Sequence, residues 1–389
     1  MKVLHLCLAS FYIDNYSYQE NLLPKYHKKM GLDVEIIASL FSFDKNGEGY
    51  YASEKKKYIN ENGIPVTRLE YKDNNISRRL RQYKGTYEAI FNASPDIIFI
   101  HGCQFIDIKE VARYLDNHSN VKVYVDNHAD FSNSARNWLS KNILHKVIWR
   151  ECAQKIEPYT SKFYGVLPAR VDFLKDIYKI PKQKVELLVM GADDDIVKKA
   201  NNPSSRELIR KKYNIGPNDF LILTGGKIDF AKTQTLLLMK AIKEINKTNI
   251  KLIVFGSIVN ELKQEVEDLV DGNQIQFVGW VNSEESYNYF AAADLLVFPG
   301  RHSVYWEQAV AMGKPIVVKH WKGTTHVDLG GNCIYLYEDS VEELYKVIEQ
   351  ITSKSKIYNK MKEKAISNLK DKFLYSNIAK LSIDEYHKN

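Results

Sequence analysis

The strongest constraint on the fold is a regular alternation that runs along the whole chain. Short apolar runs rich in β-branched residues are separated by longer stretches with helical spacing of apolar residues, such as 18–30, 76–92, 108–117 and 134–157. Apolar runs of this kind are typical of parallel strands that helices bury on both faces. The alternation therefore predicts an α/β fold. The strand candidates of the first half are VLHLCLA, DVEIIAS, PVTRLE, DIIFIHG, VKVYVDN, FYGVLPA and VELLVM.

The second half repeats this rhythm, and 389 residues are more than one core usually serves, so we expect two domains. A charged, turn-rich segment without strands marks the boundary between Rossmann-like domains over residues 1–190 and 191–370. A C-terminal helix over residues 371–389 is expected to pack back on the first domain. Because doubly wound sheets bind ligands at the carboxyl ends of their strands, the two domains are expected to face a cleft. The strand candidates of this half are DFLILTGG, IKLIVFGS, IQFVGW, DLLVFPG, PIVVKH and CIYLY.

The composition is that of a soluble globular protein. Hydrophobic residues make up 44% of the chain and charged residues 26%, which excludes a disordered chain. The formal net charge of +7 is mild and scattered, so it does not indicate nucleic-acid binding. The four cysteines form no C-x-x-C pair and are expected to be reduced, mostly buried thiols of a cytoplasmic protein. The N-terminal MKVLHLCLAS is expected to be a first buried strand rather than a signal peptide.

A glycine–basic loop lies in the segment LILTGGKIDFAKTQ. Gly225 and Gly226 follow a strand and allow a ligand to approach the backbone, and a helix is expected to begin near Thr233. Lys227 and Lys232 flank this turn, so the loop predicts a diphosphate site. The alternative is an ordinary strand-to-helix turn with solvated lysines. The spacing of a P-loop is absent, and no G-x-G-x-x-G follows the first strand.

A second candidate site lies in FPGRHSVYWEQ. A helix is expected to begin near Ser303 and Val304, with the serine as its N-cap, and Arg301 and His302 next to the free N–H groups favour an anion. Glu307 lies about one turn further on, where a carboxylate could accept hydrogen bonds from the vicinal diol of a ribose. The alternative for Glu307 is a solvated acid on a helix surface.

Polar residues also follow strands of the first domain. His128 comes directly after VKVYVDN, at the carboxyl end of a parallel strand, and could donate to a sugar hydroxyl or interact with phosphate. A structural histidine is the alternative. In the loop after the first strand, Tyr12, Asn15 and Tyr16 are candidates for contacts with an acceptor.

A basic helical face is predicted in SRRLRQYK. It could contact an anionic membrane or a pyrophosphate-bearing acceptor, although most such faces are only solvated. The segment ADDD invites a metal site, but capping of the next helix explains it, so no metal is expected. The absence of H-E-x-x-H and G-x-S-x-G excludes the common proteases and esterases. The residues of the basic face are Arg78, Arg79, Arg81 and Lys84.

Taken in order, these motifs resemble the retaining glycosyltransferases of the GT-B fold, most closely glycosyltransferase family 4. The resemblance is clearest over Val185–Val318, through VELLVMGADDD, the glycine–basic loop, LIVFGS, IQFVGWVNSEESYNYFAAADLLVFP and EQAVAMGKPIVV. The first half matches more loosely, through its strand order, His128 and YQENLLPKYHKKMGLDVEIIAS. The tail DKFLYSNIAKLSIDEYH is similar to the final helix of the family, which crosses back to the first domain.

The resemblance implies a nucleotide-sugar substrate, expected to be a UDP-sugar, held mainly by the second domain without a metal or cofactor. Lys227, where the family usually has arginine, and Lys232 would neutralise the diphosphate. Glu307 matches the second acid of the E-x7-E motif and would bind the ribose, and His128 would lie close to the donor sugar. Main chain at Gly279, Trp280 and Val281 would contact the base.

Two departures from the family pattern affect the expected function. Pro299 stands where the first acid of E-x7-E is expected, so Arg301 and His302 become the candidates for selecting the donor sugar. The loop SFYIDNYSYQEN lacks the usual glycines, which implies a remodelled acceptor side. We expect retaining, metal-independent hexosyl transfer to a glycan, lipid-linked or protein-linked acceptor in bacterial surface polysaccharide synthesis, with peripheral contact to the inner membrane face. The alternatives are a non-catalytic GT-B partner subunit and a UDP-sugar epimerase.

Overall fold

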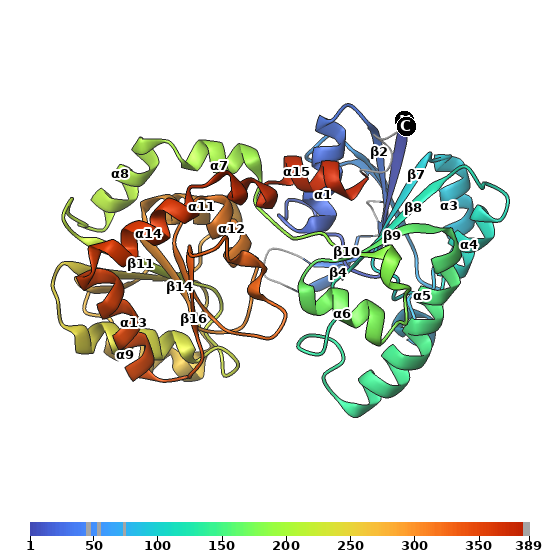
Figure 1. Cartoon of the computed structure of the whole chain (residues 1–389). Coiled ribbons are helices and arrows are strands. Elements are labelled where there is room, and N and C mark those ends of the chain that lie inside the picture. The colour runs from blue at the N-terminus through green and yellow to red at the C-terminus, as the bar shows by residue number, and fades with distance from the viewer. Residues whose placement is uncertain (44–47, 53–55, 73–74, 384–389) are drawn as a thin grey trace. The chain divides into compact units, whose positions relative to one another are not determined.

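The computed structural model describes residues 1–43, 48–52, 56–72 and 75–383, and the chain divides into two compact units. Unit 1 comprises Met1–Met190 together with the C-terminal residues from Tyr375, and unit 2 comprises Gly191–Leu374. Each unit contains a largely parallel, Rossmann-like sheet whose strands are joined by helices (Figure 1). The alternation of apolar runs therefore predicted the α/β class and the two Rossmann-like sheets correctly.

The sheet of unit 1 has the strand order β10-β9-β8-β7-β1-β2-β6-β5, and only β5 runs antiparallel to its neighbour. The chain passes outward from β1 through β2 to β6, then returns to the other side of β1 at β7. The carboxyl ends of β1 and β7 therefore form the switch point at which such sheets bind ligands. The strands are β1 (Lys2–Cys7), β2 (Asp33–Ser39), β5 (Lys57–Ile59), β6 (Pro65–Leu69), β7 (Ile97–His101), β8 (Lys122–Asn127), β9 (Thr160–Gly165) and β10 (Val185–Leu187), with a separate antiparallel pair, β3 (Phe41–Phe43) and β4 (Gly49–Tyr51).

The helices of unit 1 include the last described helix of the chain, α15 (Tyr375–Ser382), which packs against α1 (Gln19–Lys29). The rings of Tyr26 and Tyr375 stack with their centroids 6.1 Å apart. The helix expected over residues 76–92 is instead two helices, because Arg81 adopts a left-handed conformation with φ 56° that stops the first one. The remaining helices are α2 (Asn75–Arg79), α3 (Thr86–Ala93), α4 (Ile108–Leu115), the π-helix η1 (Ser140–Trp149), α5 (Arg150–Ile156), η2 (Glu157–Tyr159), α6 (Pro168–Asp176) and η3 (Lys182–Lys184).

The sheet of unit 2 is parallel throughout, with the order β13-β12-β11-β14-β15-β16. Its switch point lies between β11 and β14, so the loops after these two strands meet at one edge. The strands are β11 (Phe220–Gly225), β12 (Ile250–Phe255), β13 (Ile275–Phe277), β14 (Leu295–Phe298), β15 (Ile316–Lys319) and β16 (Cys333–Leu336). The helices are α7 (Asp194–Ala200), α8 (Pro203–Lys212), α9 (Gln234–Ile245), η4 (Asn260–Leu262), α10 (Lys263–Leu269), α11 (Ser283–Ala292), α12 (Tyr305–Ala311), η5 (Thr325–Val327), α13 (Val341–Ser353), α14 (Ser355–Ala365) and η6 (Asn368–Phe373).

Three smaller expectations bear on the site. The four cysteines are free and buried. Asp193 caps α7 by accepting a hydrogen bond from the Asp195 N–H at 3.0 Å, which confirms the capping explanation of ADDD. Within the described ranges, no helix combines the length and the apolar character that crossing a bilayer requires.

Candidate functional site

The switch point of unit 2 carries a cluster of cations. Lys227 and Lys232 lie in the loop after β11, and Arg301 lies in the loop after the neighbouring β14. Partial burial lowers the pKa of Lys232, and the charges of Arg301 and Lys227 lower it further, against the opposing effect of Asp229. Three positive groups gathered at one edge of the sheet attract an anion strongly.

The glycines beside these cations serve close backbone packing. A Cβ on Gly225 would lie 2.1 Å from the ring of Phe255 on β12. A Cβ on Gly256 would lie 1.9 Å from the carbonyl oxygen of Gly226, which itself has φ 128°. The loops after β11 and β12 can therefore approach each other only because side chains are missing there. Space for a ligand remains at Gly226, where a Cβ would meet no atom of the described chain within 4 Å.

The segment expected to contact a base follows β13. The carbonyl of Gly279 accepts a hydrogen bond from the Gly256 N–H at 2.7 Å, so this segment is tied to the loop after β12. Val281 is buried, whereas the indole of Trp280 is 73% exposed. The main chain of this segment is thus held in place, with the exposed indole of Trp280 beside it.

The start of α12 differs from the expectation. The helix begins at Tyr305, with Val304 as N-cap and without a side-chain cap. Ser303 contributes its carbonyl, which accepts from the Trp306 N–H at 3.0 Å, and not its hydroxyl. The prediction of a serine N-cap was therefore wrong, because the chain turns through residues 301–304 before the helical bonds begin.

Glu307 is fully buried rather than solvated. Its Oε1 atom accepts from His302 Nε2 at 2.8 Å and from His326 Nε2 at 2.7 Å. Burial would raise the pKa of Glu307, but the two histidines outweigh burial and hold it well below its ordinary value. Its Oε2 atom is buried and has no hydrogen-bond partner among the described residues. The acid is ionised at neutral pH and keeps one acceptor unused.

His302, Glu307 and His326 also offer metal-ligand atoms: among the described residues, one such atom from each lies within 4.8 Å of the other two. Their separations of 2.7 and 2.8 Å are hydrogen-bond lengths. Ligand atoms around a tetrahedral zinc lie roughly 3.3 Å apart, so the cluster would have to open to bind one. The sequence prediction missed His326, although it lies in the loop after β15, the strand next to β14.

In unit 1, His128 is paired with Asp126 at the end of β8. Its Nε2 atom lies 3.4 Å from Asp126 Oδ2, and its side chain is 32% exposed. Burial lowers the pKa of His128, but the Asp126 carboxylate outweighs burial and raises it above the ordinary value. His128 is therefore biased towards the protonated form, which donates hydrogen bonds.

Behind Asp126 runs a chain of three buried histidines that the sequence prediction missed. His101 Nδ1 lies 2.9 Å from Asp126 Oδ2, and His101 Nε2 lies 3.0 Å from His5 Nδ1. His5 Nε2 lies 3.0 Å from His27 Nδ1, and His27 Nε2 lies 2.9 Å from Ser382 Oγ in α15. The chain thus connects the C-terminal helix to the carboxylate that holds His128.

Burial and geometry constrain the protons of this chain. Burial lowers the pKa of His5 well below its ordinary value and that of His27 to about 3, so both rings are neutral. Because Asp126 only accepts, His101 must donate to it from Nδ1. At the other end of the chain, the Ala379 carbonyl accepts from the Ser382 hydroxyl at 2.8 Å and lies 3.2 Å from His27 Nε2.

The three residues expected on the acceptor side, Tyr12, Asn15 and Tyr16, lie in different environments. Tyr12 is fully buried, and its hydroxyl accepts a hydrogen bond from Asn60 Nδ2 at 2.7 Å. The prediction that Tyr12 contacts an acceptor was therefore wrong, because its ring belongs to the core. Asn15 is exposed in a left-handed conformation with φ 63°, and the ring of Tyr16 lies 5.2 Å from that of Tyr18.

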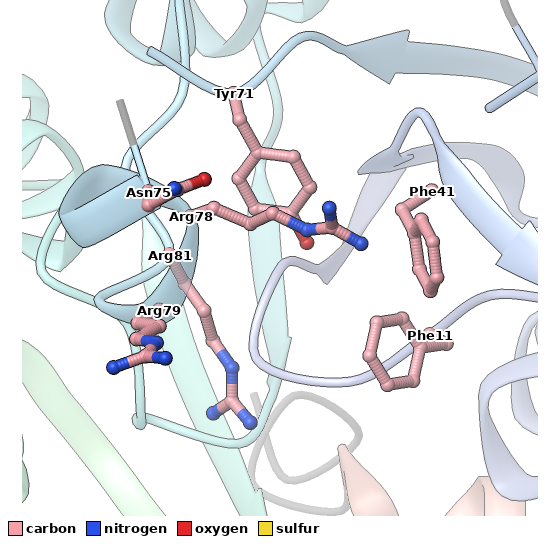
Figure 2. Close-up of a pocket in the computed structure, with 7 residues that line it drawn as sticks. All are labelled: Phe11, Phe41, Tyr71, Asn75, Arg78, Arg79 and Arg81. Atoms are coloured by element: carbon pink, nitrogen blue, oxygen red, sulfur yellow. The ribbon is translucent and has the colours of Figure 1, made fainter. Parts of the chain in front are cut away.

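The predicted basic face is not a continuous solvated face of one helix. Three of its arginines line a pocket of about 460 Å³, and Figure 2 shows Arg78 extending towards Phe41. Lys84 lies apart from them, with its Nζ atom 3.7 Å from Glu70. The left-handed Arg81 breaks the helix, which is why the helical pattern misled the prediction. The pocket is lined by Phe11, Phe41, Tyr71, Asn75, Arg78, Arg79 and Arg81.

Comparison with known proteins places this geometry in context. Residues 205–368 match the family model "Glycosyl transferases group 1". An uncharacterized glycosyltransferase of Methanocaldococcus jannaschii is 24% identical over 225 residues, which cover 54% of this chain and 55% of that protein. The chain spans about half the length of the curated relatives it matches.

Solved structures resemble the chain over its whole length. A glycosyltransferase from Rickettsia africae superposes with a TM-score of 0.70 at 18% identity, covering 100% of this chain and 98% of that one. Anabaena HepE, solved in complex with UDP-glucose, superposes with a TM-score of 0.67 at 15% identity, covering 100% of both chains. The chain therefore has the GT-B fold, and its residues 205–368 are similar to the glycosyl transferases group 1 family.

Proposed function

We propose that this protein is a glycosyltransferase that moves a sugar from a UDP-sugar to an acceptor, with retention and without a metal. The observation that carries the proposal is the cation cluster of Lys227, Lys232 and Arg301 at the switch point of a group 1 domain. A leaving UDP develops negative charge on its diphosphate, and cations placed beforehand stabilise that charge. The complex of HepE with UDP-glucose supports this class of donor.

The rest of the donor would lie against the same edge of unit 2. We assign the base to the main chain of residues 279–281, beside the exposed Trp280. We assign the ribose to Glu307 Oε2, the buried carboxylate oxygen that lacks a partner among the described residues. The His302 side chain is 11% exposed, whereas that of His326 is 3% exposed. His302 therefore lies between Glu307 and solvent, and an entering ribose must displace it.

His128 has a role that fits its protonation. The Asp126 carboxylate raises the pKa of His128 and so favours the imidazolium, which can donate a hydrogen bond to a sugar hydroxyl or a phosphate. That His128 acts on the donor sugar stays a prediction. Selection of the donor sugar by Arg301 and His302, a hexosyl group as the transferred unit, and a bacterial surface glycan as the product stay predictions. The cytoplasmic location and the contact with the inner membrane face also stay predictions.

The test removes one cation. Lys232→Ala should weaken UDP binding and transfer at least about ten-fold, because a hydrogen bond between charged groups contributes roughly 1.5–3 kcal/mol. Lys243→Ala, an exposed lysine on α9, is the matched control and should change neither. Calorimetry with UDP and turnover of a panel of UDP-sugars are the measurements. Unchanged UDP binding in Lys232→Ala would contradict the assigned site.

The same assay tests the absence of a metal. Turnover should survive EDTA, and a divalent-metal requirement would instead point to the cluster of His302, Glu307 and His326.

The missing acid at Pro299 favours one second candidate, a non-catalytic GT-B partner subunit. Such a subunit need not bind UDP, so a lack of UDP binding would favour it over the enzyme. Conversion of a UDP-sugar without any acceptor would indicate an epimerase.

A further inference from the structure

We propose that the arginine pocket of unit 1, formed by Arg78, Arg79 and Arg81 with Phe11, Phe41 and Tyr71, binds a phosphate group carried by the acceptor saccharide. This inference rests on the proposed function and names the chemical class of its acceptor. The cation cluster of unit 2 plays no part in it, so the two can be tested separately.

The first argument is the position of the pocket in the sheet. Phe11 lies in the loop after β1, Phe41 begins β3 one residue after β2 ends, and Tyr71 follows β6. These three strands are parallel neighbours, so the pocket lies at their shared carboxyl edge. Open α/β sheets bind their ligands at this edge.

The second argument is uncompensated charge. Among the described residues, no carboxylate lies within 4.0 Å of the guanidinium of Arg78, Arg79 or Arg81. Arg68, in the same unit, is paired with Asp14 at 3.4 Å. Three unneutralised guanidinium groups around one pocket suit phosphate, because each planar fork can donate two hydrogen bonds to its oxygens.

The third argument is that two of these arginines are held in place. The guanidinium of Arg78 lies over the ring of Phe41 at 4.7 Å, and that of Arg81 lies over Trp149 at 5.5 Å. Arg81 also donates to the Gln104 carbonyl at 2.6 Å. Stacking leaves the other edges of the Arg78 guanidinium free to donate and reduces the entropy lost when a ligand binds.

The fourth argument is the backbone of Arg81. Its φ of 56° lies in the left-handed region, which costs a residue with a Cβ free energy and is uncommon outside glycine, asparagine and aspartate. In a continuous helix, Arg78 and Arg81 would share a face because they are three residues apart, whereas Arg79 would lie on another face. The left-handed turn comes just after α2, and all three arginines line one pocket. Binding of a ligand by the three arginines would explain why the strained backbone is kept.

The fifth argument is the size of the pocket and the residues that line it. Both favour a phosphorylated sugar as the ligand over a membrane surface. The pocket encloses about 460 Å³, within the range of small-molecule sites. The ring of Tyr71 is fixed by stacking on buried Tyr83 at 4.7 Å, and the rings of Phe11 and Phe41 are 5.3 Å apart. Fixed aromatic rings beside arginines offer a stacking surface for a sugar and cations for its phosphate (Figure 2).

The test measures binding of hexose 1-phosphates and 6-phosphates, with the parent hexoses as neutral counterparts, by calorimetry on the full chain. We expect at least one sugar phosphate to bind the wild type and its parent hexose to bind at least about ten-fold more weakly. Arg78→Gln and Arg79→Gln should each weaken the phosphate at least about ten-fold. Lys84→Ala, which removes a lysine paired with Glu70, is the control and should leave binding unchanged.

The outcomes separate the proposals. Arg81 is left intact because its loss could unfold the turn, and unchanged melting temperatures show that Arg78→Gln and Arg79→Gln are folded. UDP binding should be unchanged in both variants, which keeps the donor site as an independent readout. Sugar phosphates that do not bind, or bind equally to both variants, would overturn the proposal even if UDP still binds. Binding only to phosphatidylglycerol vesicles, lost in Arg78→Gln, would overturn it in favour of a lipid surface.

Discussion

At the scale of single residues, the acid on α12 shows how far a side chain's role depends on its partners. Glu307 receives hydrogen bonds from His302 and His326, two residues that come from different loops of unit 2. A buried carboxylate is tolerated only when such donors compensate for lost hydration. The same donors leave Oε2 as its one unused acceptor among the described atoms, which is why we assign that atom to the ribose.

Glu307→Gln is expected to destabilise the protein. An amide of the same shape lacks the charge that strengthens the hydrogen bonds from His302 and His326, so about 3 kcal/mol of unfolding free energy should be lost. Urea unfolding followed by circular dichroism measures this. Glu244→Gln, an exposed acid on α9, is the matched control and should stay within about 0.5 kcal/mol of the wild type. A loss as small as the control's would contradict the buried cluster.

At the scale of elements, the contact between neighbouring loops decides the shape of the site. The loops after β11 and β12 approach so closely that the Gly226 carbonyl occupies the place of a Gly256 side chain. The loop after β13 joins them through the bond between Gly279 and Gly256. Three of the loops at the carboxyl edge of unit 2 are therefore held by backbone contacts, and the cations project from a rigid base.

Gly256→Ala is expected to disrupt this base. Its Cβ would lie 1.9 Å from a carbonyl oxygen, so backbone must shift, and we expect a loss of at least about 2 kcal/mol beyond the strain of its φ of 132°. Gly272→Ala separates the two effects, since Gly272 has φ 71° but open space around its Cβ. It should cost only about 1 kcal/mol. Equal losses in the two variants would show that close packing is not the reason for Gly256.

At the scale of the whole molecule, the buried histidine chain makes stability depend on pH. His5 and His27 are neutral in the folded protein because burial lowers their pKa, that of His27 to about 3. Unfolded histidines have pKa values near ~6.5, so between these values the unfolded state binds more protons. Acidification from pH 6.5 should therefore lower the free energy of unfolding, until it levels off near the folded pKa.

Urea unfolding between pH 6.5 and pH 5 should show this decrease, by up to about 1.4 kcal/mol per pH unit for each buried histidine. In this window the lowered pKa values of Asp126 and Glu307 contribute little, because unfolded carboxyl groups, with pKa values near ~4, bind few protons above about pH 5. His27→Gln should reduce the slope by up to one proton, whereas His118→Gln, half-buried at the surface, should not. Equal slopes in the two variants would contradict a neutral, buried His27.

Local pattern was sufficient for the elements of this protein. Strand candidates such as VKVYVDN and IKLIVFGS correspond to β8 and β12, because burial on both faces of a parallel sheet requires apolar runs that the sequence displays directly. Candidate residues at strand ends, such as Lys232 and His128, could be named for the same reason. Element boundaries that depend on the conformation of a single residue could not be predicted from the sequence. The helix break at Arg81 and the late start of α12 are two examples.

Which residues far apart in the sequence contact each other was decided by the tertiary structure alone. His5 and His101 lie in apolar strands 96 positions apart, and they meet because β1 and β7 are neighbours in the sheet. Glu307 could be placed on a helix from sequence, but its burial depends on His326, 19 positions further on. Periodicity records which face of an element is apolar, whereas contacts arise from how elements pack, and that packing depends on the whole chain at once.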